Sequence, residues 1–161
     1  MNHSESVDCF CQEMRAPFDG VLPEISLHLA SKEGMAELIS LLVANAHLPS
    51  STIQREGSRK REPLAGKLST KEVASLVQNG KHILLKRAFG LPDLGVGVLE
   101  DTVRLDFRTG PEWSDEQIDR LVHTLQTLRE KVSISDIYLD EMEEHFSRHG
   151  ASGFQELLEN D

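Results

Sequence analysis

The sequence predicts an α+β fold, with an antiparallel sheet of about four or five strands and helices packed mainly on one face. Residues 103–108 (VRLDFR) alternate apolar and charged side chains, which is typical of a strand with one face buried and the other in water. Residues 114–131 repeat apolar side chains at helical spacing. Residues 23–48 show the same order, an alternating segment followed by a helical one. We therefore expect strands and helices to share one core.

The length and composition of the chain indicate a single folded domain. Its 161 residues are 39% hydrophobic and 27% charged, which is ordinary for a globular protein large enough to bury a core. We place the domain at residues 21–158 and expect the polar, aperiodic residues 1–20 to form a loosely ordered arm. The longest apolar run, residues 38–44, is much shorter than the roughly 20 residues that cross a bilayer. The N-terminus lacks the basic start of a signal peptide, so we expect a cytoplasmic protein without a membrane partner.

Charge is distributed unevenly along the chain. The net charge is −10, but residues 54–87 carry +6 between an N-terminal segment of −5 and a C-terminal segment of −11. Nucleic acids attract clustered Lys and Arg, so this acidic chain is not expected to bind them. Acidic surfaces attract basic proteins over long distances, although they also simply keep proteins soluble. The composition therefore favours a basic protein partner.

The two cysteines suggest an alternative in which zinc stabilises the fold. Cys9 and Cys11 could join His145 and His149, which lie four residues apart on an expected helix. The spacing of the cysteines is tighter than the roughly two to four intervening residues of structural zinc sites. Histidines at the boundary of an amphipathic helix explain the other pair without a metal. No metal site is therefore predicted, and a cytoplasmic chain with two cysteines is not expected to form a structural disulfide.

The first strand and helix are expected between residues 23 and 48. Alternation over residues 23–30 places His28 on the face away from the core, and Ser31 can cap the helix that follows. Residues 49–67 are aperiodic and rich in Pro, Ser, Gly and charge, which predicts a mobile loop. The basic cluster at residues 55–61 lacks interleaved aromatic residues, so we expect it to be solvated.

A short helix and an inner strand should follow this loop. Ser69 and Glu72 have the spacing of a capping box, in which each side chain bonds the other residue's backbone amide. Gly80 is a typical residue at which such a helix ends. Residues 81–89 are partly apolar on both faces, as in a strand with neighbours on either side.

Residues 94–99 and 103–108 are predicted to form a hairpin joined by a tight turn. Gly95 and Gly97 fall on one face of its first strand. A phosphate-binding loop would enter a helix, whereas this segment enters another strand. The glycines therefore indicate that a neighbour packs closely over that face or that the strand is bulged.

The longest helix is predicted to begin at Ser114. Trp113 before the cap and Ile118 one turn into the helix can close as a hydrophobic staple, which gives the single tryptophan a structural role. A last helix is expected over residues 136–149, stopped by Gly150.

The sequence contains no known catalytic or cofactor-binding motif, so neither an enzyme nor a cofactor is predicted. We expect a small acidic protein-binding module, such as an inhibitor, antitoxin or immunity protein that neutralises a basic partner such as a toxin. The immunity function is an analogy that rests on size and charge. The expected partner-binding residues are the acidic side chains of Glu100, Asp101, Asp106, Glu112 and Asp115.

An alternative function remains open from the sequence. The protein could be a small-ligand-binding regulator or a small enzyme of unknown reaction, with a pocket near Arg104, Arg108 and His28.

Overall fold

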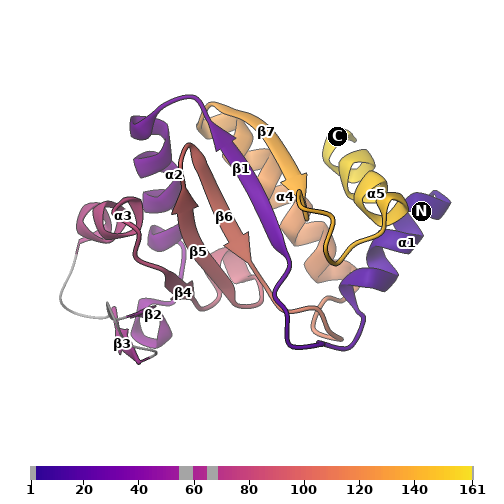
Figure 1. The fold of residues 1–161 in the computed structure, drawn as a ribbon, viewed down its shortest axis with the longest axis horizontal. Helices are drawn as coiled ribbons and strands as arrows, with labels where there is room; N and C mark the ends of the chain where they lie inside the picture. Colours follow the sequence, from indigo (N-terminus) through magenta and orange to yellow (C-terminus); the bar gives the residue numbers. More distant parts are fainter. Residues whose placement is uncertain (1–2, 55–59, 65–68, 161) are drawn as a thin grey trace.

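The computed structural model describes residues 3–54, 60–64 and 69–160. In this part of the chain the fold is α+β and contains one antiparallel seven-stranded sheet of order β3-β2-β4-β5-β6-β1-β7 (Figure 1). The strands are β1 (Glu24–Leu29), β2 (Thr52–Gln54), β3 (Arg61–Pro63), β4 (Ile83–Leu85), β5 (Leu94–Leu99), β6 (Thr102–Asp106) and β7 (Ile134–Leu139). The helices are α1 (Glu5–Met14), α2 (Lys32–Ala44), α3 (Thr70–Gln78), α4 (Asp115–Lys131) and α5 (Arg148–Glu159), with short 3-10 turns η1 (Leu48–Ser50) and η2 (Ala88–Gly90).

The sheet has more strands than the four or five expected. Strands β2 and β3 lie inside residues 49–67, which were expected to form a mobile loop. Each has only three residues, too few for an alternating pattern to be visible in the sequence. Residues 55–59, which hold two of the four basic side chains of the cluster, lie outside the described residues.

Residues 132–134 could form a short strand by their sequence, but residues 136–139 of strand β7 were expected to be helical, and a bulge explains the error. Ile134 and Asp136 pair with consecutive residues of β1, so Ser135 is an extra residue in the ladder. The bulge lets Ile134 and Ile137 both face the core although they are three residues apart. That spacing is typical of a helix and hides the strand.

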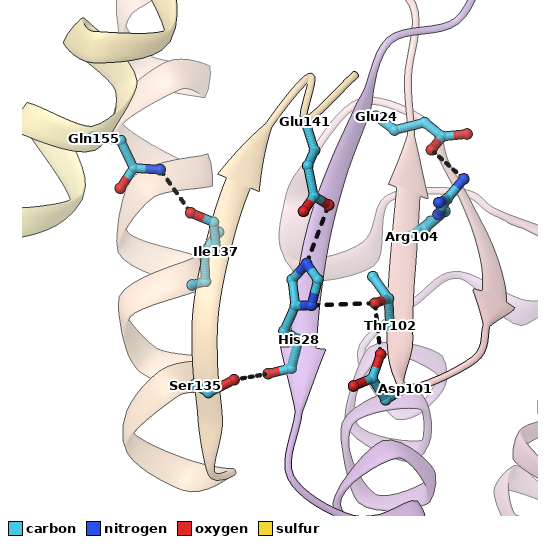
Figure 2. Close-up of polar contacts among 9 residues, drawn as sticks. All are labelled: Glu24, His28, Asp101, Thr102, Arg104, Ser135, Ile137, Glu141 and Gln155. Atoms are coloured by element: carbon cyan, nitrogen blue, oxygen red, sulfur yellow. Dashed lines mark hydrogen bonds and ion pairs between the residues drawn. The ribbon is translucent and has the colours of Figure 1, made fainter. Parts of the chain in front are cut away.

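The last helix therefore begins later than predicted. Ser147 is its N-cap, and the Ser147 hydroxyl accepts a hydrogen bond from the Gly150 amide at 3.0 Å. Gly150, expected to end a helix, lies in the first turn of α5. Gln155 of α5 donates a hydrogen bond to the Ile137 carbonyl at 2.6 Å, so this helix covers part of the outer edge of β7 (Figure 2).

The N-terminal residues are not the loosely ordered arm that their polarity suggested. Ser4 caps α1, and one side of this helix is buried in the core. Its buried residues are Val7, Phe10, Cys11 and Met14, a short helical stripe set among polar residues. Helices α1 and α5 lie side by side (Figure 1). A β-carbon at Gly153 would overlap the carbonyl oxygen of Ser6. The close approach of the two backbones requires a glycine there.

The long helix α4 lies behind β1 and β7 in the view of Figure 1. Leu121 and Leu125 of this helix are buried, and Ser114 caps it by accepting the Gln117 amide at 3.3 Å, as predicted. Trp113 is fully buried at 0% exposure.

No helix among the described residues has the length and apolar character needed to cross a membrane.

Candidate functional site

One face of the central strands carries polar side chains, and we call it the open face. On β1 and β6 the residues that alternate with the core side chains lie on this face. They are Glu24, Ser26 and His28 on β1, facing Asp106, Arg104 and Thr102 on β6. His28 lies away from the core, as the alternation of β1 predicted, and Figure 2 shows it on β1 pointing toward Glu141 and Thr102.

His28 connects three separate segments of the open face (Figure 2). Its Nε2 lies 3.1 Å from a carboxylate oxygen of Glu141, and its Nδ1 lies 3.4 Å from the Thr102 hydroxyl. The Thr102 hydroxyl donates its own proton to Asp101 at 3.2 Å, so toward His28 its oxygen can only accept. Both ring nitrogens therefore have an oxygen atom within hydrogen-bond distance. The His28 ring therefore links the loop after β7 to the first residue of β6.

Arg104 lies beside this network and has one unsatisfied donor. Its Nη1 pairs with Glu24 at 3.4 Å (Figure 2). Its Nε is buried and has no hydrogen-bond acceptor among the described residues. Burying a hydrogen-bond donor without an acceptor costs about 1–3 kcal/mol, and native proteins rarely contain such an unpaired buried donor.

A cavity of about 310 Å³, which we call the acidic cavity, opens on this part of the face. It is lined by Leu22, Glu24, Ser26, Arg104, Asp140, Glu141, Met142, Glu144 and His145. Four carboxylates therefore surround one guanidinium. Met142 is 72% exposed and Leu22 is also exposed, so the cavity has apolar as well as acidic groups at its rim.

The loop after β7 is held in place by a buried carboxylate. Asp140 has a positive φ of 51° and accepts hydrogen bonds from three backbone amides. These amides belong to Glu144, His145 and Phe146, at 3.2, 2.6 and 2.6 Å. Phe146 is itself buried in the core. The carboxylate therefore fixes the loop that presents Met142 to solvent.

A larger cavity of about 550 Å³ lies farther along the sheet. Its lining residues are Leu22, Arg61, His82, Leu84, Lys86, Pro92, Asp93, Gly95, Asp106, Phe107, Arg108 and Glu112. Their formal charges cancel, since three bases face three acids. Leu22 borders both cavities, so the two hollows are neighbours on the open face.

His82 in the larger cavity resembles a catalytic histidine but has no free ring nitrogen. Its Nε2 lies 2.7 Å from the Asp106 carboxylate, and its Nδ1 lies 3.3 Å from a guanidinium nitrogen of Arg61. Arginine can only donate, so Nδ1 must accept and Nε2 must donate to Asp106. A general base needs an available lone pair, and here Arg61 occupies it. Burial lowers the pKa of Arg61, and the charge of Asp106 opposes that effect.

Gly95 of β5 makes room for the contact between Asp106 and His82. A β-carbon at Gly95 would overlap the Asp106 carboxylate, whereas one at Gly97 would lie 3.6 Å from the His82 ring, an ordinary contact. The pairing of β5 with both neighbouring strands is continuous. Of the two explanations predicted for these glycines, close packing is therefore confirmed for Gly95.

We expect a Gly95→Ala substitution to destabilise the protein by about 1–3 kcal/mol, because the Asp106 carboxylate must leave His82 to avoid the new methyl group. Gly97→Ala is the matched control and should change stability by less than about 1 kcal/mol. Urea unfolding followed by circular dichroism measures both. Equal stability of the two variants would contradict the packing described here.

The five acidic residues predicted to bind a partner do not form one patch. Glu100 and Asp101 lie at the β5–β6 turn, and Asp106 lies at the other end of β6, about 17 Å away along an extended strand. Asp106 and Glu112 line the larger cavity, but the Asp106 side chain is only 16% exposed and pairs with His82. Asp115 forms an ion pair with Arg15 at the start of α4.

Sequence reasoning missed the carboxylates of the acidic cavity. Glu141 and Glu144 had been assigned to a helix, where adjacent acids usually form a solvated face. The signal that could have placed them is Asp140, a residue type that bonds nearby backbone amides in turns. Of the residues proposed near an alternative pocket, Arg104 lines the acidic cavity and Arg108 the larger one.

The structure does not assemble the two-Cys, two-His zinc site. Cys11 is buried in the core, and this burial raises the pKa of its thiol. Cys9 is partly exposed and donates a hydrogen bond to Glu13 at 3.1 Å. In the part of the chain that the structure describes, no three His, Cys, Asp or Glu side chains are grouped so that they could hold a metal ion.

No protein family model, no curated protein and no solved structure matches the chain.

Proposed function

We propose that the protein is a small binding module that holds a basic protein partner on its open face, as an inhibitor or immunity protein would hold a toxin. The acidic cavity is the observation that carries this proposal. It combines four carboxylates with two exposed apolar side chains, Leu22 and Met142. Acidic and apolar groups side by side suit a partner that offers both positive charge and hydrophobic contact.

Two further properties support this function. The net charge of −10 attracts a basic partner during its approach. The hydrogen bonds of Asp140 fix the loop that carries Glu141, Met142 and Glu144 before any partner arrives. A contact surface that is already ordered loses less conformational entropy on binding.

The proposed contact residues differ from those predicted from the sequence. They are Glu24, Glu141 and Glu144, with Leu22 and Met142 at the rim. Asp106 and Glu112 line the neighbouring cavity and would meet the partner only if it extended past Leu22. Glu100, Asp101 and Asp115 lie outside both cavities.

Affinity capture with charge-matched variants tests the proposal. The open-face variant carries Glu24→Gln, Glu141→Gln and Glu144→Gln, and the control variant carries Glu37→Gln, Asp119→Asn and Glu130→Gln at exposed helical positions. Both raise the net charge by three. We expect the wild type and the control to retain a basic protein from the source cells, and the open-face variant to lose it.

High salt should release the captured protein from the wild type, because the attraction is electrostatic. Equal retention by the two triple variants, or capture of a partner that is not basic, would contradict the proposed function. Circular dichroism of each variant confirms that it is folded.

The larger cavity favours a second candidate, a regulator that binds a small molecule. Its volume of about 550 Å³ lies within the range of roughly 300–1,000 Å³ typical of ligand sites. A metabolite screen by thermal shift separates this candidate from the first, since a ligand that binds only the folded state raises the Tm. Substitutions in the acidic cavity should not change the rise in Tm that a ligand of the larger cavity produces.

A further inference from the structure

We propose that the larger cavity binds a small zwitterion, with the carboxylate of the ligand on Arg108 and its ammonium group on Glu112. Free α-amino acids and short peptides carry this pair of groups. The inference rests on the second candidate function, a regulator that binds a small molecule, and it names the chemical class of that molecule. It does not require a protein partner in the acidic cavity.

Two of the three pairs of opposite charge in the larger cavity are already connected within the protein. Lys86 forms an ion pair with Asp93. The ring of His82 lies between the other two groups, with Arg61 at 3.3 Å from Nδ1 and Asp106 at 2.7 Å from Nε2. The charge of Asp106 therefore acts on the guanidinium of Arg61, and it opposes the lowering of the Arg61 pKa by burial. One base and one acid of the cavity remain.

The remaining base and acid, Arg108 and Glu112, take part in no ion pair with another described residue. The guanidinium of Arg108 lies over the ring of Phe18, 5.0 Å from its centroid. This contact uses the flat face of the guanidinium and leaves the N–H groups at its edge available. Water could solvate either charge alone, but both line one cavity whose other charges are connected. The two open groups therefore identify the complement that a ligand must bring.

The segment that carries both open groups is fixed by the core. Trp113 donates from Nε1 to the Arg108 carbonyl at 2.7 Å and from its amide to the Gly110 carbonyl at 3.2 Å. The Gly110 amide donates to the Met14 carbonyl at 2.9 Å, which attaches the segment to the end of α1. The backbone of Arg108 and Glu112 is therefore in place before a ligand arrives. A site ordered in advance loses less conformational entropy on binding.

A ligand with only one charge fits the larger cavity less well. An anion would gain Arg108 but would also enter beside the unpaired carboxylate of Glu112. A cation would meet the reverse problem. A zwitterion supplies a carboxylate that the edge of the guanidinium can bind in bidentate fashion and an ammonium group for the acid. It also keeps the sum of the charges in the cavity unchanged.

The size and wall of the larger cavity leave room for an apolar side chain on the ligand. Its volume of about 550 Å³ corresponds to about eighteen water molecules at roughly 30 Å³ each. The apolar part of the wall comes from Leu22, Leu84 and Pro92. Leu22 is 42% exposed and Leu84 is half-buried, so both can lose water when they pack against a ligand. We therefore expect a zwitterion with an apolar side chain.

Leucine and the dipeptide Leu-Leu test this inference with the full-length protein. Each is compared with its amide, which lacks the carboxylate, and with its N-acetyl form, which lacks the ammonium group. Binding is followed by amide chemical shifts in NMR titrations. We expect one of the two zwitterions to bind saturably and to shift residues 82–86, 92–95 and 106–112. Its amide and its N-acetyl form should bind at least tenfold more weakly, equivalent to about 1.4 kcal/mol each.

The comparison of leucine with Leu-Leu distinguishes the two sources of a zwitterion. The charged groups of the dipeptide are farther apart than those of the amino acid. The tighter ligand therefore shows which separation matches the site.

Arg108→Gln and Glu112→Gln determine which ligand group each residue binds. We expect Arg108→Gln to abolish the preference for the zwitterion over its amide and to keep the preference over its N-acetyl form. Glu112→Gln should do the opposite. The matched controls are Arg148→Gln, at a side chain that is 90% exposed, and Glu130→Gln on the exposed side of α4. Both controls should bind like the wild type, and circular dichroism confirms that each variant is folded.

Three results would overturn the inference. The first is that neither zwitterion binds, and the second is that the amide or the N-acetyl form binds as tightly as the zwitterion. The third is that the two preferences survive in Arg108→Gln and Glu112→Gln, which would place the ligand elsewhere. A singly charged or neutral metabolite that binds in the larger cavity would refute the zwitterion and leave the second candidate function standing. Failure of that function itself would appear in the thermal-shift screen, as no metabolite that raises the Tm.

Discussion

A Gly153→Ala substitution should separate α1 from α5 and destabilise the protein by about 3 kcal/mol. The new methyl group would overlap the carbonyl oxygen of Ser6 and lie 2.8 Å from the amide nitrogen of Val7. Both are backbone atoms, so no side-chain rotation can relieve the clash. Helix α1 must shift instead, and the burial of Phe10 is then reduced.

The direction of the expected stability change distinguishes this clash from an effect of helix propensity. Alanine at an ordinary helical glycine stabilises a protein by about 0.5–1 kcal/mol, so helix propensity alone predicts the opposite result. Ser152→Ala, at the neighbouring exposed position of α5, is the control and should unfold like the wild type. Urea unfolding followed by circular dichroism measures both variants. A Gly153→Ala protein as stable as the control would mean that α1 does not pack against α5 as described.

A Trp113→Ala substitution should cost about 3–5 kcal/mol. The side chain is fully buried, and its ring meets Phe107 edge-on with centroids 5.6 Å apart. Its Nε1 also donates a hydrogen bond to the Arg108 carbonyl at 2.7 Å. Trp113→Phe keeps much of the packing and loses this hydrogen bond, so its cost should be smaller. Circular dichroism is the appropriate signal, since the variants lack the only tryptophan.

Met142→Ala provides the contrast to Trp113→Ala. Met142 is the most exposed of the large apolar side chains in the described residues, and its truncation should leave the urea midpoint unchanged. A loss of less than about 1 kcal/mol for Trp113→Ala would contradict its place in the core. Trp113 is completely buried, and its predicted staple contact with Ile118 stays a prediction.

Local patterns predicted much of this fold. The capping box of Ser69 and Glu72 is present, and the hairpin strand at residues 94–99 has the bounds that its alternation indicated. These features depend on residues close together in the sequence, which is why they are visible there. Strand β7 was missed because the extra residue at Ser135 interrupts its alternation, and α1 because four buried residues are spread over a polar segment.

The candidate site was much less predictable. The sequence showed that the chain is acidic, but it did not show that Glu141 and Glu144 meet Glu24 around one cavity. That arrangement depends on the long-range pairing of β1 with β7 and on the turn that Asp140 organises. The unsatisfied donor of Arg104 is a property of burial in three dimensions, and no local pattern reports it.

The hydrogen bond from Gln155 to Ile137 has a consequence for self-association. An outermost strand offers free amide and carbonyl groups onto which a foreign strand can add, and aggregates grow by such additions. Here the terminal helix engages one of these groups and lies against the strand, so it obstructs that route. The same glycine contact that docks this helix onto the N-terminal one therefore also protects the β7 edge of the sheet from unwanted extension.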